Sequence, residues 1–166
     1  MKKFILGAIL VALLLSGCSS EKTGNFQLYL TDASIAGLEH VYVTMSGIYL
    51  RKQDGNWADN ILSDSLTFDL LSLRDREDIV AEVKLQEGTY TGIKLVVSAA
   101  SVVADTRTFN ITIDPPYEVI IPAVFTIRVD GTVELVLDFD AGQSLRDAGN
   151  GQYLLVPVIV VKRIGY

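Results

Sequence analysis

Residues 125–139 read Phe-Thr-Ile-Arg-Val-Asp-Gly-Thr-Val-Glu-Leu-Val-Leu-Asp-Phe, with apolar residues at alternate positions on both sides of an Asp-Gly pair. Alternation with a period of two is typical of a half-buried β-strand, because successive side chains point to opposite faces. Asp130-Gly131 between two such runs is typical of a type I′ turn. The stretch therefore predicts a β-hairpin. The same period of two in the apolar residues recurs along the rest of the chain.

The same alternation recurs at residues 26–31, 41–50, 66–70, 93–97 and 109–113. The apolar register slips at Gly47, which indicates a bulge. A last strand is expected at 153–163, where Pro157 predicts an edge position or a bulge. Since no long helical pattern and no linker interrupt the series, we expect an all-β protein. The predicted fold is a single antiparallel β-sandwich of the immunoglobulin or transthyretin-like kind.

Turns are predicted where Gly, Pro and charged residues gather. Asp54-Gly55 and Pro115-Pro116 mark chain breaks, and the charged run at 74–78 is expected to be a solvated loop. Residues 141–152 are polar and Gly-rich, with one helical turn expected around 144–147. The expected core comprises Phe68, Ile93, Leu95, Ile127, Leu135, Leu137 and Phe139.

The N-terminal segment predicts a location. Lys2 and Lys3 precede an apolar run over residues 4–15, and the sequence Leu-Ser-Gly-Cys ends at Cys18. A spanning helix needs about 20 apolar residues, so an uncleaved transmembrane anchor is the less favoured alternative. The pattern resembles a bacterial lipoprotein signal peptide, which is cleaved just before a cysteine that is acylated.

This resemblance divides the chain into a signal peptide over 1–17, the lipidated Cys18 with its tether over 18–25, and a β-sandwich domain over 26–166. It implies a protein of the cell envelope that is held on a membrane by lipid, palmitate included, on Cys18. Ser19 and Ser20 lack the acidic residue that retains lipoproteins at the inner membrane. The expected site is therefore the outer membrane of a Gram-negative cell, and otherwise the outer face of the cytoplasmic membrane.

Composition excludes some partners. Cleavage of the signal peptide would remove Lys2 and Lys3. The mature chain would then have 12 of the 14 basic residues and all 20 acidic residues, which gives a formal charge of −8. This balance argues against a nucleic-acid partner. Cys18 is the only cysteine, so the fold has no internal disulfide and depends on its apolar core.

Two further resemblances rest on short motifs. Residues 85–95, Leu-Gln-Glu-Gly-Thr-Tyr-Thr-Gly-Ile-Lys-Leu, resemble the segment that precedes a strand in transthyretin-like and carboxypeptidase-regulatory-like sandwiches. More of the chain resembles the bacterial lipoprotein family known as domain of unknown function 4382. The matching stretches are residues 30–33, 88–90, 93–95, 137–141 with Ser144, and 153–159.

Two departures from that family are visible. Ser34 stands where the family tends to have Pro after Thr-Asp-Ala, and its Pro-Ser-Gly segment is represented only loosely by residues 121–123. The resemblance implies architecture and location. It brings no catalytic or binding residue with it.

Catalytic residue types are scarce. His40 is the only histidine and no nucleophile elbow accompanies it, so a Ser-His-Asp triad is not expected. Asp138 and Asp140 share one strand face, whereas the two carboxylates of a glycosidase face each other across the bond they cleave. We assign no catalytic residue and expect a protein that is not an enzyme.

Asp32, Asp138 and Asp140 are candidates for calcium, the one cofactor that the sequence suggests. Carboxylates that converge at strand ends offer the hard oxygen ligands that calcium prefers, and Asp69 is a further possible member. The favoured alternative is that Asp32 and Asp140 cap turns with their side chains, because the chain has no calcium-loop motif.

Tyr29 and Tyr42 are the candidate binding residues. They occupy the outward register of two consecutive strands, and antiparallel pairing of those strands would place the rings side by side. A loop such as residues 74–87 could instead cover them as a second small core.

These observations favour a non-catalytic binding or structural module that recognises an envelope glycan or a protein. One alternative is a subunit of a surface assembly that contributes an edge strand, for which a free apolar edge at 157–161 would speak. A hydrolase is the third reading, and the oligomeric state is left open.

Overall fold

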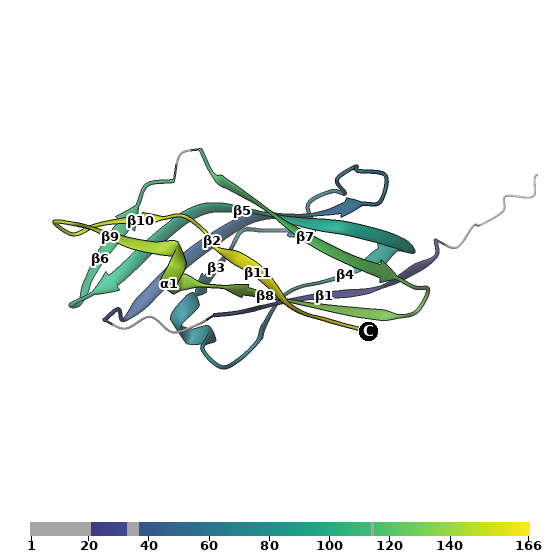
Figure 1. The fold of residues 1–166 in the computed structure, drawn as a ribbon, viewed down its shortest axis with the longest axis horizontal. Coiled ribbons are helices and arrows are strands. Elements are labelled where there is room, and N and C mark those ends of the chain that lie inside the picture. The colour runs from purple at the N-terminus through teal and green to yellow at the C-terminus, as the bar shows by residue number, and fades with distance from the viewer. Residues whose placement is uncertain (1–20, 33–36, 114) are drawn as a thin grey trace, which may run out of the picture.

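The computed structural model describes residues 21–32, 37–113 and 115–166 (Figure 1). The described residues form eleven strands, one short 3-10 helix (η1) and one single-turn helix (α1). Their bounds are β1 Thr23–Thr31, β2 His40–Lys52, β3 Leu66–Asp69, η1 Leu70–Leu73, β4 Asp78–Gln86, β5 Gly88–Ala104, β6 Arg107–Ile111, β7 Tyr117–Ile127, β8 Thr132–Phe139, α1 Ala141–Ser144, β9 Leu145–Gly149, β10 Gln152–Leu155 and β11 Ile159–Gly165.

Two sheets enclose the core, as an all-β sandwich requires. The smaller sheet has the order β11-β8-β1-β4, and the larger has the order β3-β2-β5-β6 with β7 also paired to β5. The 17-residue strand β5 serves both neighbours, because β7 pairs with its first half and β6 with its last five residues. A β9–β10 ribbon lies beside β6 at the end far from where the chain enters β1 (Figure 1).

The two sheets are mainly antiparallel. The exception is the pair β1 and β8, which run parallel at the centre of the smaller sheet. The expected signal peptide and lipidated Cys18 lie outside the described residues. β1 begins at Thr23, three residues before the expected start of the domain. No described helix has the length and apolar character needed to cross a membrane.

The predicted hairpin at residues 125–139 is wrong. β7 and β8 lie in different sheets, and only Asp130 of the Asp-Gly pair has a positive φ, at 56°. Instead of pairing its own strands, the turn bonds to the start of β1: Asn25 N donates to Gly131 O at 2.7 Å and Asp130 N donates to Thr23 O at 3.0 Å. The alternation identified the buried face of each strand but not its partner.

Gly24 permits this close approach. A Cβ at that position would lie 2.2 Å from Arg128 O, closer than any real contact. The strand β1 can therefore pass under the turn only because residue 24 has no side chain.

The core forms where the inner faces of the sheets meet. Phe26 from β1 stacks on Phe125 from β7 at a ring-centroid distance of 5.2 Å, and Tyr90 from β5 stacks on Phe125 at 5.4 Å. Six of the seven predicted core residues are buried, and Phe139 is among the largest of the fully buried side chains. Phe68 is only partly buried, since it lies on the short edge strand β3.

Three local predictions have mixed outcomes. The bulge at Gly47 is confirmed by a register shift between Met45 and Gly47 in the pairing of β2 with β5. The helical turn occurs earlier than expected, at residues 141–144. The expected last strand at 153–163 is two strands, because residues 156–158 around Pro157 carry the chain from β10 to β11, which lie in different sheets.

Candidate binding surface

The three candidate calcium ligands do not gather into a metal site. Within the described residues no group of three or more metal-ligating side chains could hold an ion. Asp32 Oδ1 accepts a hydrogen bond from Ala141 N at 2.9 Å, and Asp140 Oδ1 accepts one from Gln143 N at 2.8 Å. Asp140 is the N-cap of α1. Asp140 thus makes the turn-capping contact of the favoured alternative. Asp32 instead bonds across the fold to the first residue of α1, so it does not cap a turn of its own.

Tyr29 and Tyr42 lie on different sheets, so the predicted side-by-side arrangement is wrong. β1 pairs with β4 and β8, whereas β2 pairs with β3 and β5. The Tyr29 hydroxyl donates to Gln27 Oε1 at 3.3 Å. The expected covering loop is absent there too, because residues 78–86 form β4 alongside β1.

His40 forms a pair with Asp69. Its Nδ1 lies 2.7 Å from Asp69 Oδ2, and its ring stacks on Tyr42 at 5.4 Å. The other carboxylate oxygen of Asp69 accepts from Val41 N at 3.3 Å, which fixes the pair to the start of β2. A catalytic triad would add a nucleophile on the second ring nitrogen, and no described hydroxyl is hydrogen-bonded there.

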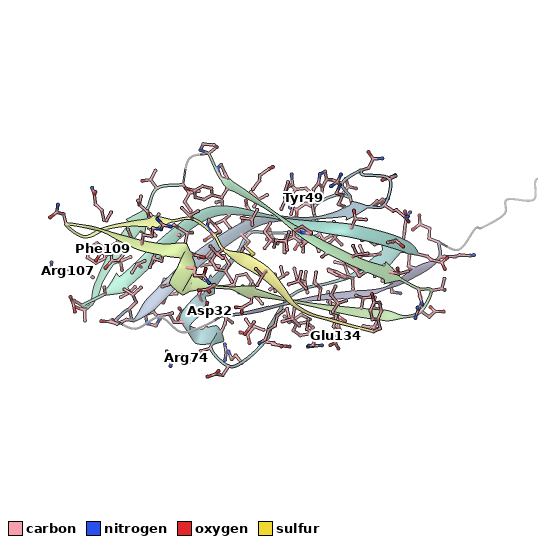
Figure 2. The ribbon with its side chains drawn as sticks, in the orientation of Figure 1. Asp32, Tyr49, Arg74, Arg107, Phe109 and Glu134 are labelled. Carbon is pink, nitrogen blue, oxygen red and sulfur yellow. The ribbon has the colours of Figure 1, made fainter. Side chains whose placement is uncertain are left out.

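A cluster of aromatic and charged side chains lies on the outer face of the larger sheet. We call Tyr49, Trp57, Lys94, Glu118 and Ile120 the outer platform. Tyr49 on β2 is opposite Lys94 on β5, which is opposite Ile120 on β7, so the three form one row across the sheet. The chain neighbours of Tyr49 and Lys94, on β2 and β5, are fully buried and face the core. Figure 2 places Tyr49 on the outer side of this sheet.

Lys94 holds the rings of the platform in place. Its ammonium lies 4.7 Å from the centroid of the Tyr49 ring and 5.5 Å from that of Trp57, distances at which cations are attracted to aromatic faces. It also bonds to Glu118 Oε1 at 3.0 Å and is only 17% exposed. Its positive charge is therefore paired with the carboxylate of Glu118.

Gly47 gives the Tyr49 ring room to lie over the strand. A Cβ at residue 47 would lie 2.7 Å from Cε2 of the Tyr49 ring. The phase slip at the same glycine changes which residues of β2 face outward, so that Tyr49 joins the outer face while Ile48 and Leu50 are fully buried. The Tyr49 ring therefore lies close to the backbone of Gly47, and Lys94 contacts both rings of the platform.

Sequence reasoning missed the platform because it depends on register. Tyr49, Lys94 and Ile120 come from three strands, and nothing in the local sequence says that they are opposite one another. The signal that was available is the single tryptophan, Trp57, placed directly after the Asp54-Gly55 turn. An aromatic residue there returns over the strand that precedes the turn, and Trp57 does bridge to Arg51.

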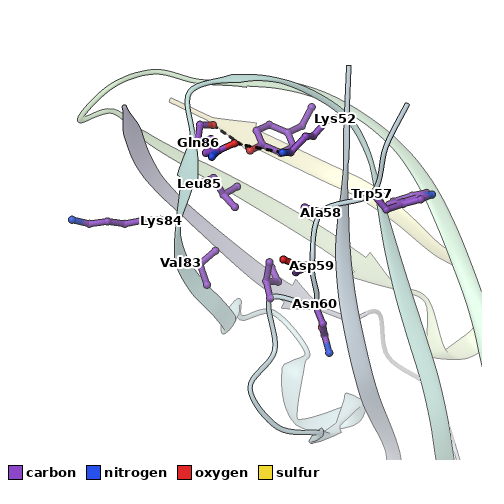
Figure 3. Close-up of a pocket in the computed structure, with 11 residues that line it drawn as sticks. Lys52, Trp57, Ala58, Asp59, Asn60, Val83, Lys84, Leu85 and Gln86 are labelled. Atoms are coloured by element: carbon purple, nitrogen blue, oxygen red, sulfur yellow. Dashed lines mark hydrogen bonds between the residues drawn. The ribbon is translucent and has the colours of Figure 1, made fainter. Parts of the chain in front are cut away.

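A cleft of about 530 Å³ opens beside the platform, between β4 and the segment after β2. Its walls include Trp57, Asn60, Val83, Leu85 and Tyr90 (Figure 3). The Tyr90 hydroxyl donates to Gln86 O at 3.2 Å. Burial raises the pKa of Tyr90 above its usual value of 10.0, so the phenol stays protonated and keeps donating.

The fold and this surface define a class of protein: a two-sheet β-sandwich with an aromatic platform on one outer face and a side cleft. The chain belongs to the family described as Domain of unknown function (DUF4382), whose model matches residues 23–157. Comparison with curated proteins and with solved structures gave no match.

Proposed function

We propose that this protein is a lipid-anchored, non-catalytic binding module of the cell envelope, and that the outer platform is its glycan-binding site. The observation that carries the proposal is the pair of half-buried rings, Tyr49 and Trp57, which both contact Lys94 on the outer face of the larger sheet. Flat apolar rings with polar groups around them suit sugar rings, which have one apolar face and a rim of hydroxyls.

The charges of the platform favour an uncharged sugar. Lys94 is paired with Glu118, and the whole chain has a formal charge of −6. An acidic polymer would be repelled by the protein as a whole and would find no free cation between the rings. Glu118 is 58% exposed, so its second oxygen can accept hydrogen bonds from sugar hydroxyls.

The envelope location rests on the sequence before the sandwich. The Leu-Ser-Gly-Cys stretch after a basic and apolar segment supports cleavage before Cys18 and acylation of its thiol. The outer membrane is the proposed site in a Gram-negative cell, and the outer face of the cytoplasmic membrane in any other. Mass spectrometry of the N-terminal peptide would show an acylated Cys18; an unmodified thiol would contradict the anchor.

A co-sedimentation assay tests the binding function. The purified lipoprotein in detergent is mixed with insoluble chitin, an uncharged polymer of N-acetylglucosamine, and the bound fraction is measured. We expect Tyr49→Ala and Trp57→Ala each to weaken binding by about tenfold or more, since one well-placed ring contributes about 1–2 kcal/mol. Tyr42→Ala is the matched control on the same sheet and should bind as the wild type does.

Two results would refute the glycan site. One is a wild-type protein that stays in the supernatant at all chitin concentrations. The other is unchanged binding by the Tyr49 and Trp57 variants. Thermal unfolding of each variant serves as the check that the sandwich is intact.

A further inference from the structure

The smaller sheet has two edges, β11 and β4, and they differ in character. β11 has a bulge between Val161 and Arg163, and its Arg163 bonds to both Glu77 and Glu134. Bulges and charged side chains at an edge discourage a further strand from pairing there. The chain thus protects β11, the edge near the expected apolar stretch at 157–161.

The edge at β4 is open. From Ala81 to Gln86 its pairing with β1 is regular, and no described residue pairs with its other side. Two clefts, of about 530 and 210 Å³, run along that side between β4 and the segment at residues 57–66. The two clefts show that space is left beside β4. The backbone N–H and C=O groups on that side of the strand are therefore available to pair with another strand.

Along β4 an acidic and a basic side chain stand on either side of an apolar one, so the strand is complementary in charge to an antiparallel copy of itself. Glu82 and Lys84 are exposed on the outer face, and Val83 between them faces the inner side and is half-buried. Lys84 makes no ion pair with any described residue, and Glu82 accepts one hydrogen bond, from Gln27 Nε2 at 3.0 Å. An approaching strand would therefore meet a negative and a positive charge that flank a small apolar residue.

We propose that β4 pairs antiparallel with β4 of a second copy of this chain, centred on Val83, so that two four-stranded sheets become one continuous sheet. A two-fold axis perpendicular to the sheet keeps each side chain on its own face. Centring on Val83 sets Glu82 of each copy opposite Lys84 of the other. Centring one residue earlier or later would instead set Glu82 against Glu82 or Lys84 against Lys84, which is destabilising.

The inner face agrees with this register. Val83 would lie opposite Val83 of the second copy, and Ala81 opposite Leu85. All three are apolar and line the two clefts. The pairing would extend each core across the axis and reduce the opening of the clefts to water.

The proposed lipid anchor is compatible with this dimer. Thr23, where β1 begins, is opposite Gln86, three residues from the axis, or about 10 Å along the strand. The two chains would therefore enter the sheet close to the axis. Both tethers could reach one membrane beneath the smaller sheets, with the outer platforms facing away from it.

Disulfide trapping in cells tests the pairing. Residues opposite each other on antiparallel strands have Cβ atoms about 4.5–5.5 Å apart, close to the spacing of a disulfide. Val83→Cys in the full chain should give a covalent dimer on mild oxidation. The control is Val160→Cys, an exposed position on the protected edge strand β11, which should stay monomeric, as should the wild type with Cys18 alone.

Charge reversal gives an independent test, read as the dimer dissociation constant of the lipoprotein in detergent. Glu82→Lys and Lys84→Glu should each raise this constant by about tenfold, since each creates two like-charge pairs. The double variant restores both pairs and should return close to the wild-type value. A monomeric wild type, a double variant as weak as the single ones, or trapping of Val83→Cys on a different protein would overturn the proposal.

Discussion

Tyr90 connects the core to the cleft through a single side chain. The residue is 3% exposed and its ring stacks on Phe125, while its hydroxyl donates to the backbone of Gln86 at the end of β4. Burial makes ionisation of this phenol harder in the folded chain than in the unfolded one, so its pKa is raised.

This shift predicts a loss of stability at high pH. A raised folded-state pKa adds stability that is complete below the unfolded value, 10.0, and is lost as the pH rises through the folded value. Urea unfolding at pH 8 and at pH 11 should show a smaller drop in Tyr90→Phe than in the wild type. At pH 8 the variant should be about 1 kcal/mol less stable, because the hydrogen bond to Gln86 is gone. An equal drop in both proteins would contradict the role given to Tyr90.

At the scale of strands, alternation predicted burial well and pairing poorly. The alternate apolar residues of 125–139 face the core as expected, except Val129, which is 44% exposed, yet the two runs belong to opposite sheets. In a sandwich both sheets bury alternate residues against the same core, so a hairpin and a connection between sheets give the same pattern. The positive φ of Asp130 suits either, and only the close approach of Gly24, distant in sequence, decides between them.

For the candidate site too, the sequence predicted which residues face outward but not which residues lie beside them. Outward-facing residues such as Tyr29 and Tyr42 could be identified from their period, but their neighbours could not, because these depend on strand order. The residues of the outer platform are brought together by the pairing register of β2 with β5 and of β5 with β7. The turn-capping role of Asp140 was predictable because it is set by the next three residues of the chain.

The central strand β8 provides a test of the core at this scale. Phe139 is fully buried where β8 ends, so Phe139→Ala should lower the free energy of unfolding by about 3–5 kcal/mol. Leu154→Ala on the peripheral β9–β10 ribbon is the control, since Leu154 is 57% exposed, and it should change stability by less than about 0.5 kcal/mol. Denaturant titration measures both, and similar losses would mean that the β8 end is not part of the core.

At the scale of the whole molecule, the open edge at β4 and the outer platform lie on different sheets. The smaller sheet carries the entry of the chain from the proposed anchor and the open edge at β4, while the larger sheet carries the outer platform on its opposite outer face. A module arranged in this way can be held at a membrane and paired with a second copy without covering the residues that would contact a glycan.

Fluorescence of the intact lipoprotein measures that central claim most directly, because Trp57 is the only tryptophan in the chain and it belongs to the platform. Titration with a soluble N-acetylated oligosaccharide, chitohexaose, should shift the emission in a saturable way as a sugar ring covers the indole. The shift should be lost in Tyr49→Ala and kept in Tyr42→Ala. An emission spectrum that stays constant while the protein still sediments with chitin would show that the glycan binds elsewhere, and the platform would lose its role.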